Sequence, residues 1–206
     1  MQTFLNLNSF DTEILYSLEN DTVIQSLEKK VKYLIIYGPN KSGKTTIAKK
    51  FSINNNIDLT NSVPDELNFN KETYLDLNTL PGQDENFFHF LQYFVTNNIP
   101  LTIFTSENSI DNLNDEFYLP DVVSRLKQFT LCNIHNPNKD LLFKLINKHL
   151  SFKSITVPEE IIIEVMNYIE RTYLSAFEAA NTINHLLYEN NHNINLSLIR
   201  KYYEQL

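Results

Sequence analysis

The residues with the clearest chemistry lie in a short stretch that contains two of the three glycines of the chain. Gly38, Gly43, Lys44 and Thr45 form the pattern Gly-x-x-x-x-Gly-Lys-Thr. Glycines let the backbone bend so that its N–H groups face a phosphate, and the N-terminus of a following helix adds a favourable dipole. In such a loop the lysine reaches the β- and γ-phosphates, and the threonine hydroxyl holds Mg²⁺. The pattern therefore predicts a nucleoside phosphate site.

The elements on both sides of this loop agree with that prediction. The apolar residues 33–37 predict a strand before the loop, and residues 46–51 continue into a helical pattern. This context makes a chance match in a surface loop the weaker alternative. The loop residues that we expect to contact the cofactor are Gly38, Pro39, Asn40, Lys41, Ser42, Gly43, Lys44, Thr45 and Thr46.

The rest of the first two thirds alternates between strand and helix patterns. Residues 57–59, 73–77, 101–106 and 129–134 predict four more strands. A short amphipathic helix is expected from residue 20 or 21 to the first strand, and another over 84–98, which begins with acidic residues and stops before Pro100. Strands alternating with helices after a phosphate loop indicate an α/β fold, a parallel sheet covered on both faces.

From Pro137 onward the pattern is helical only. We expect helices over about 140–150, 158–169, 175–187 and from 197 to the end. The predicted organisation is a short N-terminal segment (1–10), a nucleotide-binding α/β core (11–136) and a small helical lid (137–206).

Composition limits the partners and the compartment. The formal charge of −8, from 17 basic and 25 acidic residues, opposes non-specific attraction to nucleic acid, so we expect no direct sequence-specific DNA binding. No apolar run approaches the roughly 20 residues of a membrane span, and no cleavable signal is visible. One cysteine, Cys132, cannot form an internal disulfide. We therefore expect a cytoplasmic protein that does not associate with membranes.

An octapeptide just before the last predicted core strand carries a family resemblance. Residues 119–126 read Leu-Pro-Asp-Val-Val-Ser-Arg-Leu. Together with the phosphate loop and the helical lid, this stretch resembles the DnaA branch of the AAA+ ATPases, which implies a P-loop sheet core with a C-terminal lid and ADP or ATP with Mg²⁺ as cofactors. In that family the Ser-Arg supplies an arginine finger to the nucleotide of a neighbouring subunit, which assigns that catalytic role to Arg125. The alternative is an ordinary surface arginine.

The resemblance adds two further site residues. Asp76 matches the first of two family acids at a strand end, which orders Mg²⁺, so Thr45 and Asp76 are the expected metal-binding residues. Ser106 falls where the family places its first sensor and could hydrogen-bond phosphate or water.

Three positions depart from the family pattern. Leu77 occupies the place of the second acid, and leucine cannot accept a proton from water. Phe177 falls where the family has a lid arginine, and Lys41 replaces a glycine of the loop. We therefore expect nucleotide binding with weak or absent intrinsic ATPase activity, and a resting state with ADP.

Within the branch the chain resembles the short regulators of the initiator. The sequence ends after the lid, so we expect neither DnaA's helix-turn-helix domain nor its N-terminal domain. Residues 2–7 resemble the peptide with which such a regulator docks on the DNA polymerase sliding clamp (the β subunit). A clamp peptide buries alternate apolar side chains while its glutamine makes hydrogen bonds, which assigns clamp binding to Gln2, Leu5 and Leu7. A frayed terminus is the alternative.

The resulting prediction is a regulator of replication initiation that promotes hydrolysis of DnaA-bound ATP. Its expected partners are DnaA and the clamp, and the sequence leaves monomer and homodimer open. A self-sufficient ATPase or nucleotide kinase, a DnaA-like adaptor that recruits DNA or a helicase, and a diverged paralogue remain as alternatives.

Overall fold

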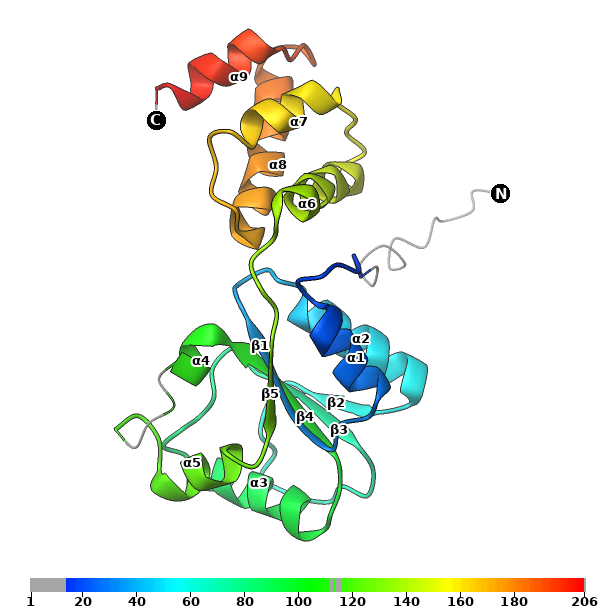
Figure 1. Cartoon of the computed structure of the whole chain (residues 1–206), viewed down its shortest axis with the longest axis vertical. Helices are drawn as coiled ribbons and strands as arrows, with labels where there is room; N and C mark the ends of the chain where they lie inside the picture. The colour runs from blue at the N-terminus through cyan, green and yellow to red at the C-terminus, as the bar shows by residue number, and fades with distance from the viewer. Residues whose placement is uncertain (1–13, 112, 114–115, 206) are drawn as a thin grey trace. The chain divides into compact units, whose positions relative to one another are not determined.

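The structure is a computed structural model that describes residues 14–111, 113 and 116–205. The chain divides between His135 and Asn136 into two compact units (Figure 1). Gln2, Leu5 and Leu7, the residues expected to bind the clamp, lie outside the described residues.

The first unit is built on a parallel sheet. Its strands are β1 (Tyr33–Gly38), β2 (Asp58–Thr60), β3 (Thr73–Asp76), β4 (Leu101–Ser106) and β5 (Thr130–Asn133). They are ordered β2-β3-β4-β1-β5, and every pair is parallel. The chain builds one side of β1 with β2, β3 and β4, and then crosses to the other side with β5. The carboxyl end of β1 is therefore the point where the strand order switches, and open α/β sheets bind ligands at such points.

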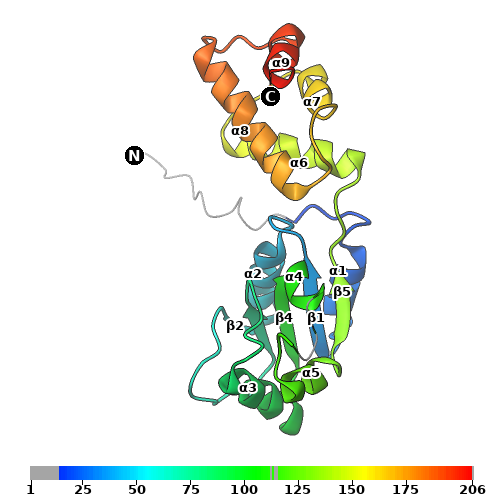
Figure 2. The same cartoon turned by 90° about the vertical axis from the view of Figure 1, so that its left-hand side faces the viewer.

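Helices cover both faces of this sheet. They are α1 (Asp21–Glu28), α2 (Lys44–Asn55), α3 (Glu85–Thr96), α4 (Glu107–Asp111) and α5 (Pro120–Leu126). Helices α1 and α2 lie on one face, α3 and α5 pack together on the other, and α4 follows β4 directly (Figures 1 and 2). Loops therefore follow the carboxyl ends of β1 and β3, whereas α4 follows that of β4.

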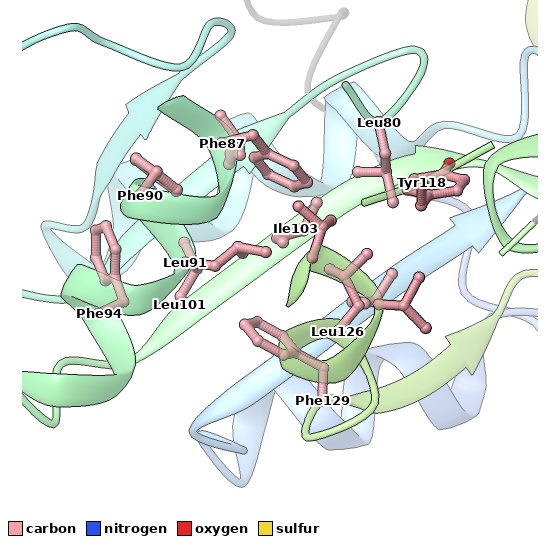
Figure 3. Close-up of a cluster of buried hydrophobic side chains, with 14 residues drawn as sticks. Leu80, Phe87, Phe90, Leu91, Phe94, Leu101, Ile103, Tyr118, Leu126 and Phe129 are labelled. Atoms are coloured by element: carbon pink, nitrogen blue, oxygen red, sulfur yellow. The ribbon is translucent and has the colours of Figure 1, made fainter. Parts of the chain in front are cut away.

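The core beneath α3 and α5 follows from the alternation of side chains along the strands. Leu101 and Ile103 of β4 point to this face, where Phe90 and Phe94 of α3 and Leu126 of α5 pack against them (Figure 3). All five side chains are fully buried. Burying a large apolar side chain contributes about 1.5–3 kcal/mol, so this cluster fixes α5 firmly on the sheet.

The second unit consists of four helices in the described part of the chain. They are α6 (Lys139–Phe152), α7 (Glu159–Val165), α8 (Tyr173–Glu189) and α9 (Leu196–Tyr203). Helix α6 packs along α8, and α7 packs against α9, where Arg200 Nε lies 2.7 Å from Glu164 Oε1. None of the described helices is long and apolar enough to cross a membrane.

The predicted elements differ from the observed ones at several ends and in two missing helices. Helix α2 continues to Asn55, four residues beyond the predicted stretch 46–51. Helix α7 ends at Val165, four residues before its predicted end, because the chain turns through bonds from Asn167 N–H to Glu164 O and from Tyr168 N–H to Val165 O. Helices α4 and α5 were not predicted. Helix α4 has five residues, which is too few for a helical repeat to be recognised. Helix α5 has proline at its start, an acidic residue in its first turn and apolar residues at helical spacing, as the predicted α7 has, so its sequence did contain a helix signal.

Candidate nucleotide-binding site

The loop between β1 and α2 carries the predicted phosphate site. Gly43, its last residue, has φ +87°, in the left-handed region that glycine adopts without strain. Lys41 also has a positive φ, of 66°, in the region that glycine adopts most readily. The backbone therefore turns sharply twice before α2 begins at Lys44.

The other loop glycine, Gly38, is required for a different reason. Gly38 ends β1, and a Cβ added there would lie 2.9 Å from both Cβ and the carbonyl oxygen of Ile134. Ile134 N–H donates to Tyr37 O over 2.8 Å, which holds the chain after β5 against the end of β1. Gly38 is thus required for close packing, whereas Gly43 is required for backbone conformation.

The conformation of Gly43 gives a testable stability effect. No atom lies within 4 Å of an added Cβ at this position, so the cost of Gly43→Ala comes from the positive φ alone. We expect the variant to lose about 1 kcal/mol in the free energy of unfolding, as measured by urea denaturation. Asn54→Ala, on the exposed face of the same helix, is the control and should stay within about 0.5 kcal/mol of the parent. Equal stability of Gly43→Ala and the parent would contradict this reading.

The first turn of α2 supplies N–H donors. Gly43 is the N-cap and offers no side-chain acceptor, unlike Asp84, Asn138 and Thr172, whose side chains cap α3, α6 and α8. The first bond of the helix runs from Ile47 N–H to Gly43 O over 2.9 Å, so the N–H groups of residues 44–46 precede the helical ladder. Such donors at the positive end of a helix dipole suit an anion.

Lys44 places its ammonium group within the loop. Its Nζ donates to the carbonyl oxygens of Gly38 and Pro39 over 2.8 Å each, and to Ser42 Oγ over 3.3 Å. Burial lowers the pKa of Lys44, and the nearby carboxylates of Asp76 and Glu107 oppose that shift. A polyphosphate would add further negative charge beside this ammonium and stabilise its charged form.

The sheet brings the other two predicted side chains beside this loop. Ser106 pairs with Gly38 in the register of β4 and β1, and Asp76 pairs with Phe104 in the register of β3 and β4. Both residues therefore end their strands at the edge where the phosphate loop begins. Glu107, for which no role was predicted, follows Ser106 and begins α4. Its carboxylate lies near enough to Lys44 to raise the pKa of that lysine. The sequence placed Glu107 beside Ser106 at the expected first sensor but gave it no role of its own.

Two apolar residues stand where the family resemblance would place catalytic groups. They are Leu77, in place of the second acid, and Phe177, in place of the lid arginine. Leu77 is half-buried, packs against the core beneath α3, and donates its N–H to Phe104 O over 2.8 Å. Phe177 lies on α8 in the second unit, where its ring makes an edge contact with His149 at 5.5 Å between centroids. Neither side chain can accept a proton or carry a positive charge.

Arg125 lies on α5, away from the loop residues in the sequence. The apolar residues Val122, Val123 and Leu126 bury one side of the helix, and Arg125 itself is half-buried. Among the described residues, no carboxylate or other acceptor pairs with its guanidinium, in contrast to Arg200, which binds Glu164. An arginine held on a short anchored helix with its donors unused can bind a phosphate presented from outside.

The donor set fits a nucleoside polyphosphate with a hard cation. Backbone N–H groups and the Lys44 ammonium suit phosphate oxygens, while the exposed Thr45 hydroxyl and the Asp76 carboxylate are oxygen ligands of the kind Mg²⁺ prefers. Within the described ranges, no group of three or more His, Cys, Asp or Glu side chains could hold a metal ion. Mg²⁺ commonly needs only one or two carboxylates when phosphates complete its coordination, so the set remains adequate.

A five-stranded parallel sheet in the order β2-β3-β4-β1-β5 with a phosphate loop after β1 is the AAA+ P-loop α/β fold, and comparison with solved structures agrees with this class. One similar structure is domain III of the replication initiation protein DnaA from Thermotoga maritima, with 12% identity, 97% of this chain and 96% of that chain covered, and a TM-score of 0.66. A second is RuvB, the Holliday junction branch migration motor of the same organism, with 16% identity, 96% of this chain and 74% of that chain covered, and a TM-score of 0.65.

A third similar structure is AMPPCP-bound DnaA from Aquifex aeolicus, with 16% identity, 88% of this chain and 67% of that chain covered, and a TM-score of 0.62. No protein-family model matches the sequence, and no curated protein matches it either. At these identities the similarity establishes the fold.

Proposed function

We propose that this protein is a nucleotide-binding regulator of replication initiation, similar to Hda, the DnaA-related protein that inactivates the initiator. In this proposal the chain binds ADP or ATP with Mg²⁺ at residues 38–46, docks on the sliding clamp through Gln2, Leu5 and Leu7, and presents Arg125 to ATP bound by DnaA. The observation that carries it is the guanidinium of Arg125, which no described residue pairs, in a chain with Leu77 where a catalytic acid would stand.

The guanidinium of Arg125 and the leucine at position 77 together favour action on the nucleotide of a partner. A site that holds phosphate but lacks a group to polarise water binds nucleotide better than it hydrolyses it. Asn78, the next residue, is exposed and uses its backbone oxygen to accept from Ser106 N–H. The nucleotide bound by this protein itself would therefore be a structural ligand that sets the shape of the first unit.

The residues of this chain would act in two separate places. At its own site, Lys44 and the N–H groups of residues 44–46 hold the β- and γ-phosphates, and Thr45 and Asp76 hold the cation. At the site of DnaA, the fork of Arg125 hydrogen-bonds phosphate oxygens as negative charge develops during hydrolysis. The ion supplies charge neutralisation at the phosphates when it is bound.

The deciding experiment measures hydrolysis by ATP-bound DnaA in the presence of clamp loaded on DNA. Adding this protein should shorten the lifetime of DnaA-bound ATP, and omitting the clamp should remove most of that effect. No change in hydrolysis on adding the protein, at concentrations that saturate the clamp, would reject the proposal.

The clamp-docking segment has its own test. We expect Gln2→Ala to weaken retention of the protein on immobilised clamp by at least about tenfold, because the glutamine hydrogen bonds would be lost in an otherwise apolar pocket. Gln83→Ala, an exposed glutamine of the first unit, is the matched control. Equal retention of Gln2→Ala and the parent would remove the clamp from the proposal.

One observation favours a second candidate, a self-sufficient ATPase. Glu107 lies near enough to Lys44 to influence its pKa, so its carboxylate could take the place of the acid missing at Leu77. Turnover by the isolated protein above about 1 s⁻¹, the low end for kinases, would support this candidate. Turnover well below that value favours the regulator.

A further inference from the structure

A buried serine joins the strand end beside the nucleotide loop to the neighbouring loop. Ser109 is only 2% exposed. Its Oγ accepts from Leu80 N–H and from Thr105 Oγ1, over 3.2 Å each, and lies 3.4 Å from Ser106 Oγ. One hydroxyl thus connects the end of β4 with the loop that follows β3.

The same serine holds the segment that leads into α5. The hydroxyl of Tyr118 donates to the backbone oxygen of Ser109 over 2.9 Å. Burial raises the pKa of Tyr118, so the hydroxyl stays protonated and remains a donor. The tyrosine ring lies beside Leu80 at the edge of the core (Figure 3).

The opposite side of Tyr118 is closed by Gly82. A Cβ added to Gly82 would lie 2.3 Å from Cδ1 of Tyr118, so the ring packs directly on the glycine backbone. Leu119 N–H donates to Gly82 O over 2.7 Å. The two residues before α5 are therefore fixed by three contacts: the tyrosine hydroxyl, its ring and the next backbone N–H.

These contacts set where α5 begins. Pro120 is the first residue of α5, directly after Leu119, and Arg125 follows within the same short helix. Val122 and Leu126 anchor the helix on the core, and the fixed segment before Pro120 holds its first turn. A small shift at Tyr118 would therefore move the guanidinium of Arg125.

We propose that Tyr118, held between Ser109 and Gly82, is a positioning residue that ties helix α5 and its Arg125 to the strand end beside the nucleotide loop. This inference rests on the proposed function, because it assigns Tyr118 a role in the action of Arg125 on a partner nucleotide. Tyr118 touches no phosphate itself. It acts by holding the arginine where its fork meets the reacting group, and a displacement of about 1 Å can cost a reaction up to 10²-fold in rate.

The test compares two tyrosines that make the same kind of bond. Tyr118→Phe removes the hydroxyl but keeps the ring on Gly82. Tyr93→Phe is the control, because the Tyr93 hydroxyl of α3 donates to Phe69 O over 2.8 Å and accepts from Phe69 N–H over 3.2 Å, and makes no bond to Ser109. Both variants should bind nucleotide as the parent does, since neither residue belongs to the phosphate site.

The first readout uses the isolated protein and does not depend on DnaA. We expect amide hydrogen exchange over residues 119–127 to be about fivefold to tenfold faster in Tyr118→Phe and unchanged in Tyr93→Phe. Unchanged exchange in Tyr118→Phe would overturn the proposal. Gly82→Ala, which displaces the ring from the other side, should accelerate exchange in the same segment.

The second readout uses hydrolysis of DnaA-bound ATP. Tyr118→Phe should lower the maximal stimulated rate about tenfold while the concentration for half-maximal stimulation stays at the parent value. A purely structural loss would instead raise that concentration, and that result would overturn the positioning role. If the parent protein gives no stimulation at all, the proposed function fails, whereas the exchange measurement still decides whether Tyr118 positions α5.

Discussion

We expect Arg125→Ala to return the hydrolysis of DnaA-bound ATP to the rate of DnaA alone, a loss of up to about 10³-fold to 10⁵-fold if Arg125 is a full arginine finger. The reason lies in the geometry of α5. The helix is anchored by Val122, Val123 and Leu126, and no described residue uses the donors of Arg125. Alanine removes the charge without disturbing the buried side of the helix.

Two further variants make this result specific. Arg125→Lys keeps a positive charge but loses the planar fork, so it should restore only a small part of the stimulation. Arg200→Ala truncates an arginine of the second unit that binds Glu164, and it should stimulate as the parent does. Stimulation by Arg125→Ala at the parent rate would show that the arginine has no role in hydrolysis.

The second large effect concerns Lys44. We expect Lys44→Ala to lower the affinity for MgADP and MgATP by about 10²-fold or more, because charged hydrogen bonds to phosphate are lost from a partly buried site. Isothermal titration calorimetry measures the loss directly. Thermal unfolding gives an independent value, since ligand at 100 times its Kd stabilises the parent by about 2.7 kcal/mol and should protect the variant far less.

The control for Lys44 lies on the same helix. Lys49→Ala removes an exposed lysine of α2 that does not belong to the loop, and nucleotide binding should be unchanged. Circular dichroism should confirm that both variants are folded. Parent-like heat and protection in Lys44→Ala would reject the loop as the phosphate site and, with it, the proposed regulation by nucleotide.

The parts of the fold that depend on local pattern could be predicted from the sequence. The strand over Leu101–Ser106 was predicted with its exact bounds, and β1 and β3 to within a residue at each end, because apolar residues bounded by turn formers mark them. The loop with Lys44 was predicted from its spacing and from the strand and helix patterns on its two sides, and the structure has β1 and α2 at those places. Helix α4 was missed because five residues are too few to show a period, and α5 was missed although its sequence has the same helix signals as α7.

The contacts that complete the site join residues far apart in the sequence. Position 38 requires glycine because Ile134, 96 positions later, packs against it, and no pattern around Gly38 predicts that neighbour. Glu107 reaches toward Lys44 only because β4 pairs with β1. The bond from Tyr118 to Ser109 likewise depends on where the chain returns after α4. Such contacts follow from strand pairing and packing, which a single sequence does not specify.

Strand β1 lies inside the sheet, and this position determines which amides a bound nucleotide would protect from exchange. β1 is hydrogen-bonded on both sides, to β4 and β5, whereas β2 and β5 form the edges. An outer strand can unpair by itself, but an inner strand exchanges its amides only when its hydrogen bonds to a neighbouring strand also break. The loop that would hold phosphate is an extension of this inner strand. Nucleotide should therefore slow amide exchange along the whole length of the inner strands β1 and β4, and much less in the edge strands β2 and β5.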